Sequence, residues 1–211
     1  TEAFSNPPLT NSIRALRLDV NGTSENSIIE LLEDGRLTNI EELKLDRCDL
    51  TERTIDAIIN ATHIRNLRRI SLWGNRGIGD AAARIFSSHH MRSLRDVSLN
   101  SVGMSGTALA RELGKLDFDA PLETLGLQSN EIGDEGAIAI ANTPHLGSLS
   151  TCYLYSSKVG EKGVVALANS PNLKRISLLH LGNDPGSEEG RRALLESPYL
   201  PERIKRAWVQ E

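Results

Sequence analysis

The sequence predicts an α/β solenoid, a stack of similar units that each contain one strand and one helix. Leucines recur at intervals of 27, 27, 27, 28, 27 and 24 residues, at Leu18, Leu45, Leu72, Leu99, Leu127, Leu154 and Leu178. Each leucine ends a stretch in which apolar and polar residues alternate, as in a strand, and most are followed by a stretch with helical spacing. A repeat of this length is typical of units that bury their apolar faces by stacking.

The expected architecture is one elongated domain with a parallel β-sheet on its concave face and helices on its convex face. We expect an N-terminal extension or the start of a fragment over residues 1–12, seven repeats over 13–186 and capping helices over 187–211. This division leaves no room for a separate catalytic domain, so we do not expect an enzyme.

Each strand is expected to be short, with side chains that alternate between the core and the open side of the sheet. The helices that follow are expected over residues 51–59, 79–86, 106–113, 133–141 and 160–168. Acidic residues near three of the helix starts, Asp80, Asp134 and Glu161, suit the positive end of the helix dipole. Prolines just after several helices stop further winding because proline lacks the backbone N–H.

One position after each strand is expected to connect neighbouring turns by hydrogen bonds. It is occupied in turn by Asn21, Cys48, Asn75, Val102, Asn130, Ser157 and Leu181. An asparagine side chain at this position can satisfy the backbone groups of the adjacent turn, so that a stack of repeats forms a ladder.

With this ladder position and a period of 27–28 residues, the chain resembles leucine-rich repeat proteins of the ribonuclease-inhibitor-like subfamily over about residues 13–200. The segment Asn130–Asn142, NEIGDEGAIAIAN, carries the resemblance most clearly. The resemblance implies a leucine-rich repeat horseshoe that binds a protein partner. The sequence departs from the pattern at Val102 and Leu181. The C-terminal segment with Ile204 and Trp208 is similar to the ends of bacterial proteins of this type, which implies a bacterial origin.

The uncovered face of the sheet is the expected binding surface. Three of the eight aromatic residues of the chain, Trp73, Tyr153 and Tyr155, are expected on this face. Leu179 and His180 are expected to extend the patch beyond Tyr155. Exposed aromatic side chains are enriched at interface hot spots. The alternative interpretation is that they pack against neighbouring strands as cross-strand pairs.

The N-terminal half of the same face is expected to be charged. Arg17 and Lys44 lie beside Asp19 and Asp46 in adjacent columns. We expect these charges to pair diagonally, which adds little stability on a surface. A second interpretation is a site for an acidic peptide, formed by Arg47, Arg69 and Trp73.

Composition and motifs argue against several functional classes. A net charge of −4 and a pI near 5.8 argue against a nucleic-acid partner. No stretch approaches the ~18 apolar residues of a membrane span. Phosphate-binding, nucleophile-elbow and zinc-binding motifs are missing, so we expect no catalytic residues, metal or cofactor. His63, His90 and His145 share one repeat position, but it falls in a loop where a polar residue is tolerated.

The spacing of the two cysteines indicates in which cellular compartment the protein is expected. Cys48 and Cys152 lie four repeats apart, which at ~4.8 Å per strand places them about 19 Å apart, too far for a disulfide. Free cysteines favour a reducing compartment. We therefore expect a cytoplasmic monomer, with a secreted effector as the alternative.

These observations predict a non-enzymatic scaffold that binds a protein on its concave face. One alternative is a regulator of an enzyme, such as a GTPase activator, because the same repeat subfamily includes such proteins. Another is the recognition segment of a larger sensor or substrate-recruiting protein.

Overall fold

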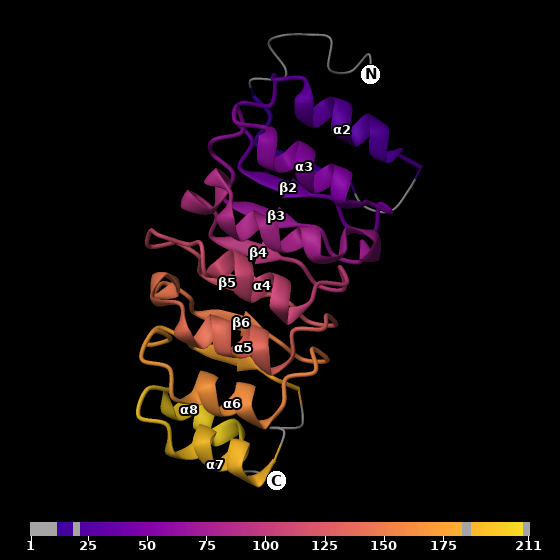
Figure 1. Cartoon of the computed structure of the whole chain (residues 1–211). Coiled ribbons are helices and arrows are strands. Elements are labelled where there is room, and N and C mark those ends of the chain that lie inside the picture. The colour runs from indigo at the N-terminus through magenta and orange to yellow at the C-terminus, as the bar shows by residue number, and fades with distance from the viewer. Residues whose placement is uncertain (1–11, 19–21, 183–186, 209–211) are drawn as a thin grey trace.

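The structure is a computed structural model that describes residues 12–18, 22–182 and 187–208. Its strands pair in chain order into one seven-stranded parallel sheet that runs along the length of the molecule (Figure 1). They are β1 (Ala15–Arg17), β2 (Glu42–Lys44), β3 (Arg69–Ser71), β4 (Asp96–Ser98), β5 (Thr124–Gly126), β6 (Thr151–Tyr153) and β7 (Leu178–His180). The fold is therefore an α/β leucine-rich repeat solenoid, as the sequence predicts.

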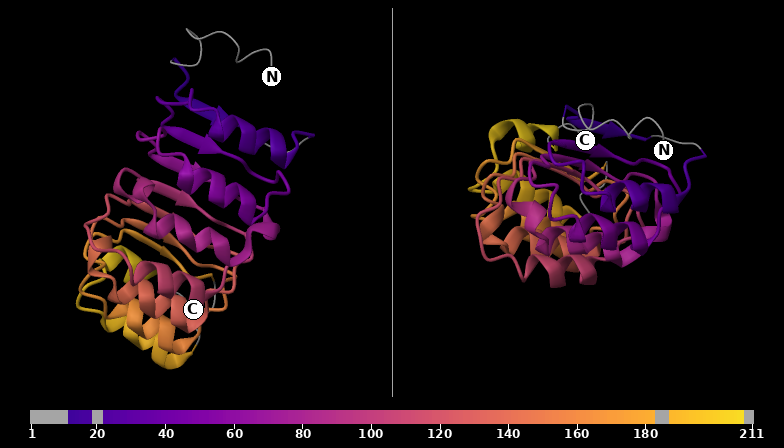
Figure 2. Two further views of the ribbon diagram at one scale, coloured as in Figure 1. Left: turned by 45° about the horizontal axis from the view of Figure 1, so that its top comes forward. Right: turned by 90° about the horizontal axis from the view of Figure 1, so that it is seen from above.

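The segments between the strands wind into helices that form a layer on one side of the sheet (Figure 2). The α-helices are α2 (Glu25–Glu33), α3 (Glu52–Asn60), α4 (Gly106–Leu113), α5 (Gly133–Asn142), α6 (Glu161–Ala168), α7 (Glu188–Glu196) and α8 (Glu202–Ala207). Shorter 3₁₀ turns are η3 (His89–Arg92) and η4 (Pro144–Leu146). Ser24, Thr51 and Ser105 cap the helices that follow them, because each side chain accepts a hydrogen bond from a backbone N–H of the first turn.

The third repeat differs from the expected α-helix over residues 79–86. The chain forms a 3₁₀ segment, η2 (Arg76–Ser87), which is interrupted at Gly79 with φ 57°. The N–H of Gly79 donates to the carbonyl of Val102 in the next repeat, at 2.9 Å. A left-handed residue cannot continue a right-handed helix, so Gly79 separates a first turn from the winding that follows.

The predicted ladder is present at Asn75 and Asn130. The Asn130 amide oxygen accepts from the N–H groups of Val102, Gly103 and Met104, at 3.0–3.1 Å. Its amide nitrogen donates to the carbonyls of Leu99 and Leu127, which directly follow β4 and β5, at 2.7 and 2.9 Å. Asn75 likewise accepts from the N–H of Cys48 and donates to the carbonyls of the leucines that follow β2 and β3. Asn21 lies outside the described residues.

The last repeat corrects the predicted register. β7 pairs with β6 so that Leu179 is opposite Cys152 and His180 is opposite Tyr153. The residue equivalent to Leu154 is therefore Leu181, 27 residues further along the chain. The expected step of 24 residues to Leu178 is wrong, as is the assignment of Leu181 to the ladder.

Burial explains why the register takes this form. Leu179 and Leu181 are 6% and 8% exposed, whereas Leu178 is 41% exposed. Shifting a strand by one residue exchanges its two faces, so only one of two adjacent leucines can enter the core. Leu179 packs inward and is not part of the concave surface, contrary to the prediction.

The core is a continuous ribbon of buried aliphatic side chains between the sheet and the helices, from Leu16 in β1 to Ile204 in α8. Cys152 is buried within it, and Cys48 is half-buried at its edge. No helix among the described residues is long and apolar enough to cross a membrane.

Candidate functional site

The concave face, defined here as the sheet face without helices, has a shallow groove at its centre. The groove extends from β2 to β6 and has a volume of about 220 Å³. Its floor is formed by the small residues Ser71, Ser98 and Gly126 on three consecutive strands. A side chain at Gly126 would collide with the Asn100 amide, since an added Cβ would lie 2.8 Å from Oδ1. The groove therefore depends on small residues in the strand column.

The N-terminal end of the face carries an ion-pair network centred on Glu42. Arg17 donates to one carboxylate oxygen of Glu42 at 3.0 Å, and Arg69 donates to the same oxygen at 3.0 Å. Hydrogen bonds from Arg17 and Arg69 keep the pKa of Glu42 below its usual value. Arg69 is thus engaged with Glu42, and the hydrogen bonds described for its side chain go to Glu42.

Asp46 has a structural role that the sequence does not reveal. It is 4% exposed, although the alternation of the strand places it in an outward column. Its carboxylate accepts from the Ser71 hydroxyl at 2.6 Å and from the backbone N–H of Trp73 at 3.0 Å. Lys44 pairs with Asp46 of its own repeat, at 3.5 Å. Asp19, the other expected acidic residue of this end, lies outside the described residues.

Arg47 and Trp73 form a cation–π pair. The guanidinium carbon of Arg47 lies 4.9 Å from the centroid of the Trp73 ring. Trp73 is 40% exposed. Gly74 makes this contact possible, because an added Cβ would lie 2.7 Å from Cγ of Arg47. The side chains predicted to meet here do so, and the charge of Arg47 is directed onto the indole.

The C-terminal end carries three rings in contact, which we call the aromatic patch: Tyr153, Tyr155 and His180. The His180 ring meets both tyrosine rings edge-on, with centroid separations of 6.1 and 5.0 Å. Both tyrosines are half-buried, and His180 is exposed. The rings thus pack against one another across β6 and β7 and still present one surface to solvent.

Trp73 is not part of the aromatic patch. Trp73 follows β3, which is separated from β6 by two strands, and this corresponds to roughly 14 Å at the usual strand spacing. The predicted surface is therefore divided into two clusters, one at each end of the groove.

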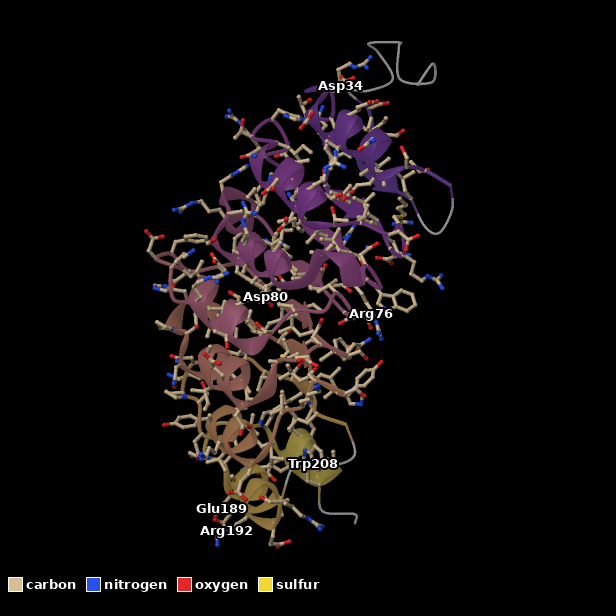
Figure 3. The ribbon with its side chains drawn as sticks, turned by 45° about the vertical axis from the view of Figure 1, so that its right-hand side comes forward. Asp34, Arg76, Asp80, Glu189, Arg192 and Trp208 are labelled. Atoms are coloured by element: carbon tan, nitrogen blue, oxygen red, sulfur yellow. The ribbon has the colours of Figure 1, made fainter. Side chains whose placement is uncertain are left out.

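A second cavity, which the sequence did not predict, lies between β7 and the C-terminal helices. We call it the C-terminal cleft; it has a volume of about 630 Å³. Its walls include Leu178 and His180 of β7, Arg191 of α7 and Arg203 of α8, together with Trp208. Figure 3 shows Trp208 beside α8, near the C-terminal end of the molecule. The basic residues of this segment are visible in the sequence, but their proximity to β7 depends on how α8 packs.

The histidines that share one repeat position do not have a common set of contacts. His90 is buried, and its Nε2 lies 2.8 Å from the carbonyl of Ile58. Burial lowers the pKa of His90 to about 4, so the imidazole is neutral at physiological pH. His145 contacts Asp119 instead, at 3.0 Å. Among the described residues, no group of His, Cys, Asp or Glu side chains is arranged to hold a metal ion.

Comparison with known proteins agrees with this architecture. A family model described as leucine-rich repeat matches residues 120–141. None of the curated proteins matches the chain.

Two solved structures are similar to this chain. A chain of the yeast Rad7–Elc1 complex has a TM-score of 0.49 and 14% identity, over 89% of this chain and 61% of that chain. The tropomodulin C-terminal domain of Caenorhabditis elegans has a TM-score of 0.48 and 18% identity, over 88% of this chain and 95% of that one. This chain thus spans 61% of the length of the yeast chain.

Proposed function

We propose that this chain is a non-catalytic scaffold that binds a protein partner through its concave face. The observation that carries the proposal is the aromatic patch of Tyr153, Tyr155 and His180, which lies on the face of the sheet that no helix covers. Tyrosine supplies a large contact area with few rotatable bonds and is enriched at the centres of protein interfaces.

The two ends of the groove are not equivalent as binding surfaces. At the N-terminal end Glu42 is already paired with Arg17 and Arg69, so a partner would have to replace existing ion pairs. At the C-terminal end the rings offer apolar edges and hydroxyl groups, and the contacts described for them are with one another. The aromatic patch is therefore the proposed anchor, and Arg47 with Trp73 forms a secondary contact.

The proposal includes a repeat subfamily and a cellular compartment. The 27–28-residue period and the asparagine ladder support a place in the ribonuclease-inhibitor-like subfamily. The free, buried thiol of Cys152 favours a reducing compartment, so we propose a cytoplasmic monomer. The bacterial origin implied by the C-terminal segment stays a prediction.

Affinity capture with matched variants tests the proposal. The immobilised chain is incubated with extract of the source organism, and bound proteins are quantified by mass spectrometry. The concave variant is Tyr153→Ala with Tyr155→Ala, and the control is Lys162→Ala, an exposed position on helix α6 of the same repeat.

A partner that uses the concave face is lost with the tyrosine variant and retained with Lys162→Ala. With the purified partner, we expect the dissociation constant to rise roughly 30-fold or more for the tyrosine variant, as for hot-spot residues. An unchanged constant for a variant that keeps its native circular dichroism would show that the concave face is not the binding surface.

A further inference from the structure

β7 is the last strand of the sheet, and its outer edge has backbone groups that the preceding strands use for pairing. At the two ends of β6, the Ser150 carbonyl accepts from the N–H of Leu178, and the Leu154 N–H donates to the carbonyl of His180. The equivalent groups on β7 are the carbonyl of Ser177 and the N–H of Leu181. Within residues 12–18, 22–182 and 187–208, neither of these two groups has a hydrogen-bond partner.

Leu179 adds two more groups to the same edge. β7 pairs with β6 through the N–H of Leu178 and the carbonyl of His180. Because successive residues of a strand point their backbone groups to opposite sides, the N–H and carbonyl of Leu179 are directed away from β6. The edge thus offers donors and acceptors in the spacing of a parallel ladder, and such an edge is a template for another strand.

The C-terminal cleft lies along this edge. One wall is formed by Ser177 to His180 and Gly182, and the other by residues of α7 and α8. α8 therefore lies beside the edge without filling the space next to it. An added strand would lie ~4.8 Å from β7, within the cleft.

The charges of the cleft indicate what it would bind. Among the described residues, its lining includes two arginines and no acidic residue. Nε of Arg191 donates to the carbonyl of Trp208 at 3.0 Å, which fixes the direction of the guanidinium. Arg203 is exposed, and the described part of the chain provides no ion-pair partner for it. Leu178 and Trp208 add apolar surface beside these charges.

We propose that the C-terminal cleft binds an extended acidic segment of a protein partner as an eighth strand of the sheet. The backbone of the segment pairs with Ser177, Leu179 and Leu181, and its carboxylates meet Arg191 and Arg203. Apolar side chains of the segment contact Leu178 and Trp208. Affinity comes from the ladder hydrogen bonds and selectivity from the side-chain contacts, as in other cases of strand addition.

This inference deepens the proposed function by naming the chemistry of one partner segment, and it uses residues outside the aromatic patch except for His180. The two proposals can fail separately. A partner whose binding is weakened by the tyrosine variant but not by Arg203→Glu would retain the concave face as the binding surface and overturn the strand addition.

The test uses the full chain with Trp73→Phe, which leaves Trp208 as the single tryptophan of the two in the sequence. The probe is a seven-residue peptide in which glutamate and leucine alternate, with both ends blocked. We expect saturable binding that changes the Trp208 fluorescence and slows hydrogen exchange at the N–H of Leu181. A peptide with lysine in place of glutamate should bind at least tenfold more weakly.

Two charge reversals on one helix provide the matched comparison. Arg203→Glu places an acidic residue in the wall of the cleft, whereas Arg206→Glu makes the same change on α8 outside the wall. We expect roughly tenfold weaker binding for Arg203→Glu, the loss of about one charge-assisted hydrogen bond. Arg206→Glu should change the affinity by less than about threefold, because the charge is exposed and screened.

Backbone pairing is tested with two further peptides, each carrying N-methyl groups on one of the two alternating sets of amides. Only one set faces β7, so one peptide should lose binding and the other should keep it. Equal binding of both peptides would overturn the strand addition, as would equal effects of Arg203→Glu and Arg206→Glu. Absence of binding up to about 1 mM peptide would do the same. Self-association of the chain without peptide, measured by sedimentation, would also overturn it if the N–H of Leu181 were then already protected from hydrogen exchange.

Discussion

The two ends of the concave face are built from the same repeat but differ in how their polar groups are paired. At the N-terminal end, Glu42 is neutralised by two arginines and the guanidinium of Arg47 rests on Trp73. At the C-terminal end the rings of Tyr153 and His180 contact each other, and the edge of β7 has backbone groups without described partners. The buried columns maintain the stack at both ends, while the outward columns are free to differ. We infer from this difference that the charged groups at the N-terminal end pair mainly within the chain, whereas the aromatic end can bind a partner.

The largest expected effect concerns the register of the aromatic end. Leu179→Ala removes a side chain that is 6% exposed, and we expect a loss of about 2–4 kcal/mol in the free energy of unfolding. Leu178→Ala removes one that is 41% exposed, and the loss should stay within about 0.5 kcal/mol. Urea denaturation followed by circular dichroism measures both. Equal losses would place the wrong leucine in the core and remove the basis for the β7 edge.

Asp46 provides the next largest effect, at the charged end. Asp46→Ala leaves the hydroxyl of Ser71 and the N–H of Trp73 without their acceptor, and should cost about 1–3 kcal/mol of unfolding free energy. In a Trp208→Phe background, the emission of Trp73 should also shift. Asp46→Asn retains an acceptor oxygen and serves as the control, with a smaller loss and little spectral change. If the alanine variant leaves the emission of Trp73 unchanged, Asp46 does not position the indole.

The ion pairs of Glu42 should give a smaller effect that depends on pH. Because Arg17 and Arg69 lower the pKa of Glu42 below its usual 4.5, the ionised carboxylate stabilises the fold above that pH. This contribution is lost as the pH falls through the lowered pKa. Both arginines are more than half exposed, so solvent screening limits the contribution to about 0–1 kcal/mol.

The measurement compares urea unfolding of the wild type and Glu42→Gln between pH 7 and pH 3. The difference in unfolding free energy should be greatest near neutral pH, decrease below pH 4.5 and diminish in 1 M salt. A difference that grows as the pH falls would reverse the assigned sign. The affinity of the aromatic patch for an identified partner should not follow this titration, since none of its residues contacts Glu42.

The smallest effect is expected for the cation–π pair. Arg47→Ala should lower the unfolding free energy by no more than about 1 kcal/mol, because the pair is exposed. In the Trp208→Phe background, it should make Trp73 more accessible to acrylamide quenching. The same substitution in the Trp73→Phe background should leave the quenching of Trp208 unchanged. A change at Trp208 would mean that the two ends are coupled, contrary to the comparison.

Most of the fold could be predicted because the same pattern of apolar and polar residues recurs in each repeat. The leucine period placed the first six strands, and the ladder position identified Asn75 and Asn130 before their hydrogen bonds were known. Prediction failed where the pattern became ambiguous: adjacent leucines at 178 and 179 fit two registers. It also failed at η2, where the positive φ of Gly79 interrupts the expected α-helix.

The candidate site was predicted only in part. Tyr153 lines the groove of the concave face and Arg47 lies over Trp73, whereas the binding role predicted for the aromatic residues stays a prediction. The contact of His180 with both tyrosines depends on the pairing of β6 with β7, which the predicted register did not contain. Asp46 was expected outside and lies inside, because hydrogen bonds from the next strand cover its carboxylate.

The sequence by itself determined that this chain stacks into a solenoid, because apolar residues at a fixed period can be buried only against the neighbouring repeat. Only the tertiary structure decided which leucine of the last strand enters the core, and thereby which backbone groups remain on the edge of β7. It also decided that α8 lies beside that edge and leaves a cleft. Both outcomes depend on packing between segments distant in the chain, and a local pattern of alternation carries no information about such contacts.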